Sequence, residues 1–400
     1  MKFTYKTTMI SCFVGSMVQA IIVNFVPLLF VTFQNTYNIP LSKITALVTV
    51  NFCIQLMTDV VAVKYADKIG YRASLIIAHT VAATGLILLT FLPEIIDPFF
   101  GILISVIIYA VGGGLLEVVV SPVVESCPSD NKEKAMSLLH SFYCWGYVGV
   151  VLLSTIFFRI VGINNWRILT LLWAVIPVVN NFVLLKVPLA PLIPTGERGM
   201  TTRELFGNKV FLIMFLMMLC SGASEQAVAQ WASALAEKGL GISKTLGDLA
   251  GPMMFAALMG LARAFYGKFG DRINLDKFMM CSALLCVASY ALITFAPHPL
   301  LSLAGCALCG VAVGIMWPGT LSQSASMLRN GGTAMFALLA VGGDLGCTIG
   351  PTLVGTVSDL LNGNMKLGIL AACVFPVLLT LCLVINMERK RKNEKGNKST

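Results

Sequence analysis

The chain has 400 residues, of which 57% are hydrophobic and only 12% are charged, and its formal net charge is +9. A soluble globular domain carries about 25% charged residues, so this composition excludes an ordinary soluble protein. The apolar stretches reach about 20 residues, the length of an α-helical membrane span rather than of a barrel strand of about ten residues. The sequence therefore predicts an all-α integral membrane protein.

The positive charge does not indicate nucleic-acid binding, because the Lys and Arg residues lie in short loops and at the chain ends. The basic run from Glu388 to Lys392 follows a long apolar stretch, as expected for a segment beside lipid headgroups. Most of the 12 cysteines lie within apolar stretches, where they behave as small hydrophobic residues. We expect no disulfide framework, no metal, no cofactor and no enzymatic activity.

Hydropathy along the chain predicts about twelve membrane spans. If both termini are cytoplasmic, most Lys and Arg residues of the connecting segments fall on the cytoplasmic side, as the positive-inside rule requires. This distribution supports an even number of spans, with both termini on the cytoplasmic side of a cell membrane. The predicted spans cover residues 8–33, 41–63, 73–92, 98–124, 134–158, 166–187, 209–235, 245–267, 277–296, 299–327, 333–357 and 366–387.

The longest internal loop, 188–208, is predicted to be a cytoplasmic linker between an N-terminal bundle, 1–187, and a C-terminal bundle, 209–387, with a basic tail at 388–400. Three features recur in order in the two halves. They are the loops Asp67–Arg72 and Gly267–Arg272, the prolines Pro122 and Pro318, and the pairs Ala135-Met136 and Ala334-Met335. Such a repeat predicts two pseudo-symmetric bundles of about six helices each.

These features resemble the major facilitator superfamily, whose loop signature is G-x-x-x-D-R/K-x-G-x-R/K. The second copy keeps the Gly and the Asp-Arg pair of this signature, whereas the first has Val63 in place of the leading Gly. The resemblance implies the major facilitator fold and a monomer. It also implies that Asp67, Arg72, Asp271 and Arg272 form a gating charge network that does not contact the substrate.

A narrower resemblance is to the fucose permease branch of that family. It rests on Gly112–Gly114 before an intramembrane Glu117, with Ser121-Pro122 following. The resemblance also includes Glu225 before Trp231, and Trp317-Pro318. It implies sugar uptake coupled to protons, or to sodium as in some animal relatives. One departure leaves the coupling ion open, since Val23 stands four residues before Pro27, where the branch has an Asp.

Charged side chains inside spans are costly and therefore mark functional candidates. Glu117 lies midway along its span and is the first candidate for binding the coupling ion; the alternative is a protonated side chain bonded to a neighbouring helix. Asn51, Gln55 and Asp59 share one helical face, which fits a substrate wall, a cation site at Asp59 or interhelical packing. His140 fits a proton relay with Glu117, or a bond to a backbone carbonyl.

Amide side chains both donate and accept hydrogen bonds, and indoles can stack on a pyranose, so both residue types suit a sugar. The alternative for the indoles is ordinary core packing. Arg263 and Asp344 either neutralise each other or gate the cytoplasmic side. The predicted substrate-binding residues are Asn24, Asn51, Gln55, Tyr143, Trp145, Glu225, Gln226, Gln230, Trp231, Trp317 and Asp344.

The sequence thus predicts a secondary active transporter that moves a sugar-like polar solute together with H⁺ or Na⁺ by alternating access. An alternative is a proton-driven exporter of drugs or metabolites, which the many Met residues of the seventh and eighth spans keep open. They are Met214, Met217, Met218, Met253 and Met254. A membrane sensor or scaffold is a further alternative, but it would not need buried carboxylates.

Overall fold

A computed structural model describes residues 3–39, 41–191, 199–232, 235, 249–362 and 364–396 of the chain. Within this part every regular element is a helix. Ten helical segments of the described residues are long and apolar enough to cross a membrane, and helix α3 (Leu41–Ile69) contains the shorter apolar stretch Val50–Ala62. The prediction of an all-α membrane fold is confirmed.

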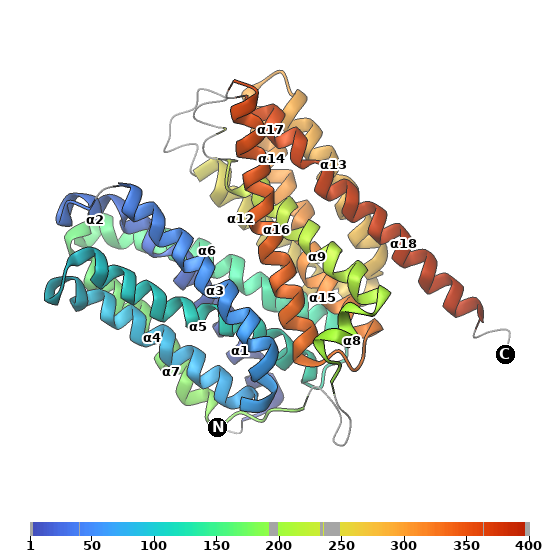
Figure 1. The fold of residues 1–400 in the computed structure, drawn as a ribbon, viewed down its shortest axis with the longest axis horizontal. Helices are drawn as coiled ribbons and strands as arrows, with labels where there is room; N and C mark the ends of the chain where they lie inside the picture. Colours follow the sequence, from blue (N-terminus) through green and yellow to red (C-terminus); the bar gives the residue numbers. More distant parts are fainter. Residues whose placement is uncertain are drawn as a thin grey trace. The chain divides into compact units, whose positions relative to one another are not determined.

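The chain divides into two compact units (Figure 1). Unit 1 comprises Met1–Asp130, Phe142–Met200 and Asn330–Leu338. Its elements are α1 (Tyr5–Asn24), η1 (Val26–Leu29), α2 (Phe30–Tyr37), α3 (Leu41–Ile69), α4 (Tyr71–Ile95), α5 (Pro98–Ser126), η2 (Ile163–Asn165) and α7 (Trp166–Leu184). Helices α6 (Lys132–Val161) and α16 (Gly332–Leu360) contribute residues to both units.

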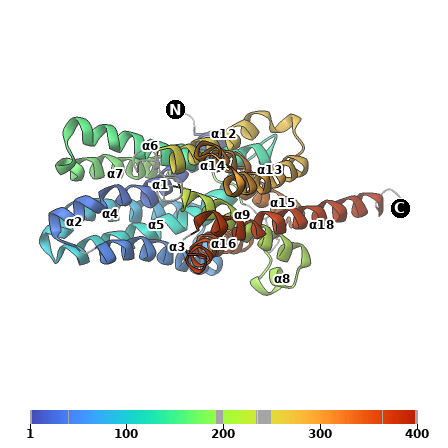
Figure 2. The same ribbon diagram turned by 90° about the horizontal axis from the view of Figure 1, so that it is seen from above.

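Unit 2 comprises Asn131–Ser141, Thr201–Arg329 and Leu339–Thr400. Its elements are α8 (Thr202–Phe206), α9 (Lys209–Ala229), η4 (Leu249–Met253), α12 (Met254–Phe269), η5 (Gly270–Arg272), α13 (Leu275–Phe295), α14 (Pro299–Val313), α15 (Met316–Met327), α17 (Met365–Ala372) and α18 (Val374–Gly396). Helix α18 extends beyond the other helices of unit 2 (Figure 2). It continues past the predicted span end at residue 387 into the basic tail.

Three glycines place α5 among the other helices of unit 1. A Cβ atom at Gly112 would stand 2.7 Å from the carbonyl oxygen of Ala78 in α4, and one at Gly114 would stand 2.8 Å from that of Gln55 in α3. At Gly113 the nearest atoms belong to the Gln55 amide and to Ile22 of α1. Small residues allow membrane helices to approach this closely, so the glycine run sets α5 against three neighbours.

Two predicted spans are broken at prolines. The first predicted span is divided into α1, η1 and α2 around Pro27, and the tenth into α14 and α15 just before Pro318. Proline has no backbone N–H and cannot donate to the carbonyl four residues earlier, which interrupts the helix. The twelfth predicted span is also divided, at Cys373 between α17 and α18.

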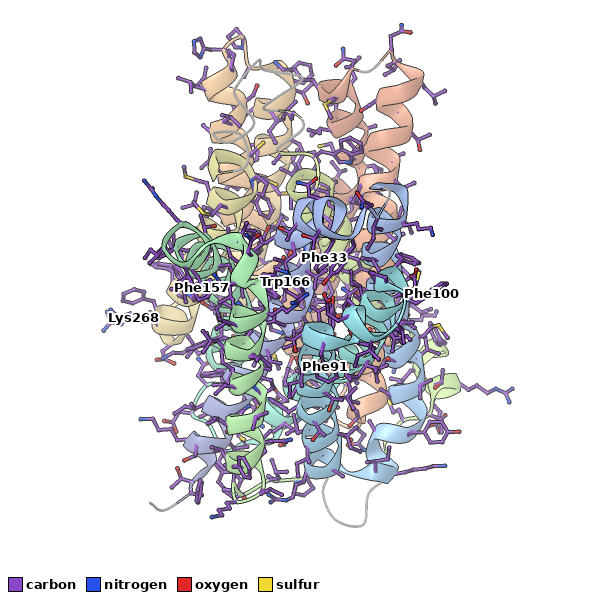
Figure 3. The ribbon with its side chains drawn as sticks, turned by 90° about the vertical axis from the view of Figure 1, so that its left-hand side faces the viewer. Phe33, Phe91, Phe100, Phe157, Trp166 and Lys268 are labelled. Atoms are coloured by element: carbon purple, nitrogen blue, oxygen red, sulfur yellow. The ribbon has the colours of Figure 1, made fainter. Side chains whose placement is uncertain are left out.

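The short helix α2 is anchored to α4 and α7 by side chains. Phe33 packs edge-on against Trp166, with ring centroids 5.4 Å apart, and the two rings lie together in Figure 3. The Tyr37 hydroxyl donates to Glu94 at 2.8 Å and accepts from Arg167 at 2.9 Å. Arg167 also pairs directly with Glu94. The segment after the first break is therefore held by aromatic and ionic contacts.

Candidate functional site

Two carboxylates meet inside unit 1. Asp59 of α3 is completely buried, and one of its oxygens lies within 4.8 Å of a carboxylate oxygen of Glu117 in α5. Glu117 also accepts a hydrogen bond of 2.7 Å from Gln19 of α1. Two negative charges this close in a membrane-spanning unit repel each other unless a proton or another cation lies between them. The pair is thus chemically suited to bind a cation.

Two amide side chains, Asn51 and Gln55, lie on the same face of α3 as Asp59. Asn51 and Gln55 are 5% and 3% exposed, so both are buried like Asp59. The Asn51 Oδ1 atom and the Gln55 Nε2 atom have no hydrogen-bond partner among the described residues. A buried polar atom without a partner is costly, which makes these two atoms candidates for binding a polar ligand.

Unit 2 contains a buried ion pair of a different kind. Glu225 of α9 lies 3.3 Å from the Arg263 guanidinium of α12, and both side chains are largely buried. Arg263 also donates to the carbonyl oxygens of Gly314, at 2.8 Å, and His140, at 3.1 Å. The charge of Glu225 is therefore balanced within unit 2.

Two of the predicted indole platforms pack against α16 in unit 2. Trp231 donates a hydrogen bond of 3.0 Å to the Pro351 carbonyl, and its ring lies over Gly355. The Trp317 ring lies so close to Gly343 that a Cβ atom there would stand 2.1 Å from it. Both residues remain partly exposed.

The other predicted site residues have varied surroundings. Asn24 donates to the Ala20 carbonyl within α1, and Gln226 lies 3.5 Å from its neighbour Glu225. Trp145 and Gln230 are exposed, whereas Tyr143, His140 and Asp344 are partly buried. His140 lies in the stretch of α6 that belongs to unit 2 and Glu117 in unit 1, and their proton relay stays a prediction.

Apart from Arg263, which lies within α12, the residues predicted to gate lie at the ends of helices. Arg72 donates to the carbonyls of Leu184, at 2.6 Å, and Val187, at 2.8 Å, and so caps the end of α7. Asp271 accepts from Lys134 and, at 3.0 Å, from Asn131. The hydrogen bond from Lys134 holds the pKa of the Asp271 carboxyl below its usual value. Arg272 is exposed, and the side chain of Asp67 lies outside the described residues.

Several polar side chains of unit 1 that the sequence did not single out form hydrogen bonds between helices. Gln19, which donates to Glu117, is one of the few polar side chains of the first predicted span, and that is the signal that could have identified it. His79 of α4 is fully buried and lies 2.8 Å from Asn180 of α7, whose amide also donates to the Ser11 carbonyl at 2.9 Å. This network joins three helices of unit 1.

Comparison with known proteins places the chain in a family. A family model for the Major Facilitator Superfamily matches residues 8–351 and 253–400. The membrane protein MosC of Rhizobium meliloti is 24% identical over 298 residues, which are 73% of this chain and 69% of MosC.

Solved structures share the fold at low sequence identity. FucP in its outward conformation superposes with a TM-score of 0.81 at 15% identity, covering 95% of this chain and 99% of FucP. A second structure of FucP, the E. coli fucose:proton symporter, gives a TM-score of 0.78 at 15% identity, with 95% and 98% covered. The proton:xylose symporter XylE, bound to 6-bromo-6-deoxy-D-glucose, gives 0.77 at 13% identity, with 94% of each chain covered. This chain belongs to the major facilitator superfamily of membrane transporters and has its fold.

Proposed function

We propose that this transporter carries a sugar-like polar solute together with a cation, H⁺ or Na⁺. The observation that supports this most directly is the approach of Asp59 to Glu117 within 4.8 Å inside unit 1. One bound cation would relieve the repulsion between the two carboxylates. A cation that binds this pair with different affinity in two conformations of the carrier would shift the equilibrium between them.

The solute would bind next to the cation. The unpartnered Gln55 Nε2 is a donor and the unpartnered Asn51 Oδ1 is an acceptor, and both lie on the face of α3 that carries Asp59. A sugar hydroxyl both donates and accepts, so it can satisfy each of them. In unit 2 the proposed solute contacts are Gln226 and the indoles of Trp231 and Trp317. Adjacent binding of solute and cation provides the favourable coupling free energy that symport requires.

The structures of FucP and XylE support a sugar as the first solute class to test. Of the five Met residues that favour the exporter alternative, Met214, Met217 and Met218 are completely buried in α9, whereas Met254 of α12 is 45% exposed. We further propose that the protein acts as a monomer in a cell membrane with both termini cytoplasmic. Reporter fusions at the two termini test that orientation.

The decisive experiment measures uptake into proteoliposomes under an inward proton gradient and then under an inward sodium gradient. The panel comprises L-fucose, D-xylose, other labelled hexoses and nucleosides. We expect one sugar to accumulate under one gradient, and Glu117→Gln or Asp59→Asn to abolish that accumulation. Glu388→Gln, a matched change in the exposed tail segment, should have no effect. Accumulation that survives Glu117→Gln would refute the proposal.

A further inference from the structure

The break between α14 and α15 leaves a backbone carbonyl without its helical donor. Pro318 lies four residues after Gly314 and has no N–H, so the usual α-helical donor to the Gly314 oxygen is missing. The Arg263 Nε atom of α12 donates to this oxygen at 2.8 Å. Neighbouring side chains make proline tolerable in membrane helices by satisfying the freed carbonyl, and Arg263 is in the position to do so.

Close packing brings Arg263 to the break. A Cβ atom at Gly314 would stand 2.9 Å from the Ala262 Cβ, and one at Gly310 would stand 2.4 Å from the Phe255 carbonyl oxygen. Helix α12 therefore lies directly against the end of α14. Arg263 is only 3% exposed, and a guanidinium buried to this degree needs a counterion. Glu225, at 3.3 Å, supplies the negative charge.

The break also determines where the Trp317 side chain lies. Trp317 follows Gly314 by three residues and precedes Pro318 directly. Its ring fits only because position 343 of α16 has no side chain. A change in the geometry at Gly314 would move the backbone of Trp317, so the indole would leave its place on α16.

We propose that Arg263 is a positioning residue that holds the break of the tenth span and thereby orients the Trp317 indole toward the solute, with Glu225 acting as its counterion. The orientation of Trp317 follows from contacts within unit 2, and only its contact with a solute rests on the proposed function. Glu225 would then act as a counterion and not as the direct substrate contact that the sequence predicted.

Two electrically neutral double variants separate the hydrogen bond from the charge. In Glu225→Gln/Arg263→Gln the new amide nitrogen occupies the same place along the side chain as the arginine Nε and can still donate to Gly314. In Glu225→Gln/Arg263→Met the side chain has a similar length but no donor. Incorporation of 5-fluorotryptophan gives ¹⁹F signals for the five tryptophans, and Trp317→Phe identifies the Trp317 signal.

We expect the Gln double variant to keep the Trp317 signal at its parental position, and the Met double variant to shift or broaden it while the other four signals stay in place. Equal spectra for the two variants, whether both parental or both changed, would overturn the proposal. This readout needs no substrate, so it stands even if the sugar-uptake experiment fails. If a sugar is transported, its KM should rise roughly three- to tenfold in the Met variant only, the value of one aromatic contact.

A third variant covers the case in which the Met double variant does not fold. Adding Pro318→Ala restores a backbone N–H that can donate to the Gly314 oxygen. The triple variant should therefore fold, with thermal stability near that of the Gln double variant. A triple variant that remains unfolded would show that the carbonyl is not the cause, and would overturn the proposal.

Discussion

Gly114 of α5 lies against the backbone of Gln55 in α3: a Cβ atom at position 114 would stand 2.8 Å from the Gln55 carbonyl oxygen and 3.0 Å from its Cα. Asp59 follows Gln55 by four residues, and Glu117 follows Gly113 by four, so each carboxylate lies about one helical turn beyond this contact. The close approach at the glycines thus sets the register that brings Asp59 and Glu117 together.

Gly114→Ala should destabilise the protein and impair coupled uptake, because the added methyl group meets backbone that cannot rotate away. Overpacking of this kind costs about 1–3 kcal/mol. Thermal unfolding of the purified protein measures the effect. The matched control is Gly149→Ala in α6, where a Cβ atom meets nothing within 4 Å. If both variants melt at the same temperature, the close packing of α3 against α5 does not limit the thermal stability of the protein.

Gln55→Met should separate stability from transport. The Gln55 Nε2 atom is buried without a partner among the described residues, so its removal should leave the melting temperature unchanged or raise it. Uptake of a hydroxylated solute should nevertheless become weaker, with a higher KM. An unchanged KM would remove Gln55 from the proposed solute site, and a large loss of stability would show that the amide has a structural partner.

The ion pair between Lys134 and Asp271 should contribute a small stabilisation that depends on pH and salt. The pKa of Asp271 is lowered chiefly by its hydrogen bond from Lys134. A carboxyl with a lowered pKa stabilises the folded state fully above its unfolded-state pKa of about 4, and this contribution is lost as the pH falls below that value.

Asp271→Asn should therefore lower the melting temperature slightly at pH 7 and by a smaller amount near pH 3, because the contribution declines as the pH falls through the lowered pKa of Asp271. Because the pair is exposed, high salt should reduce the difference at pH 7. Melting curves at the two pH values, with and without added salt, check this prediction. A larger effect at the acidic pH would contradict it.

Tyr37→Phe should loosen α2 without unfolding unit 1. The variant loses the hydroxyl that links Glu94 and Arg167, at a cost of about 0.5–1.5 kcal/mol, but keeps the packing of Phe33 on Trp166. Hydrogen exchange should accelerate in residues 30–37 and remain parental in α4 and α7. Tyr5→Phe, at the other end of the first predicted span, serves as control. Equal exchange in the two variants would mean that the aromatic contact alone anchors α2.

The sequence by itself determined the membrane class and the helical architecture, because hydropathy and span length depend only on residue order. It also identified Glu117, Asp59 and the stripe of Asn51 and Gln55, since an isolated polar residue is conspicuous in an apolar span. The sequence predicts the helix breaks only in part. It shows the prolines, but the length of an apolar stretch does not show where the hydrogen bonds of its helix are interrupted.

Tertiary structure alone decided which polar groups meet. That Gln19 donates to Glu117, and that Arg263 pairs with Glu225 and satisfies the carbonyl freed by Pro318, depends on the rotation and depth of separate helices. Single-helix periodicity gives the face on which a residue lies but not its partner on another helix. The contacts of glycines such as Gly114 set those rotations and depths, so the geometry of the candidate site appears only once the helices are packed.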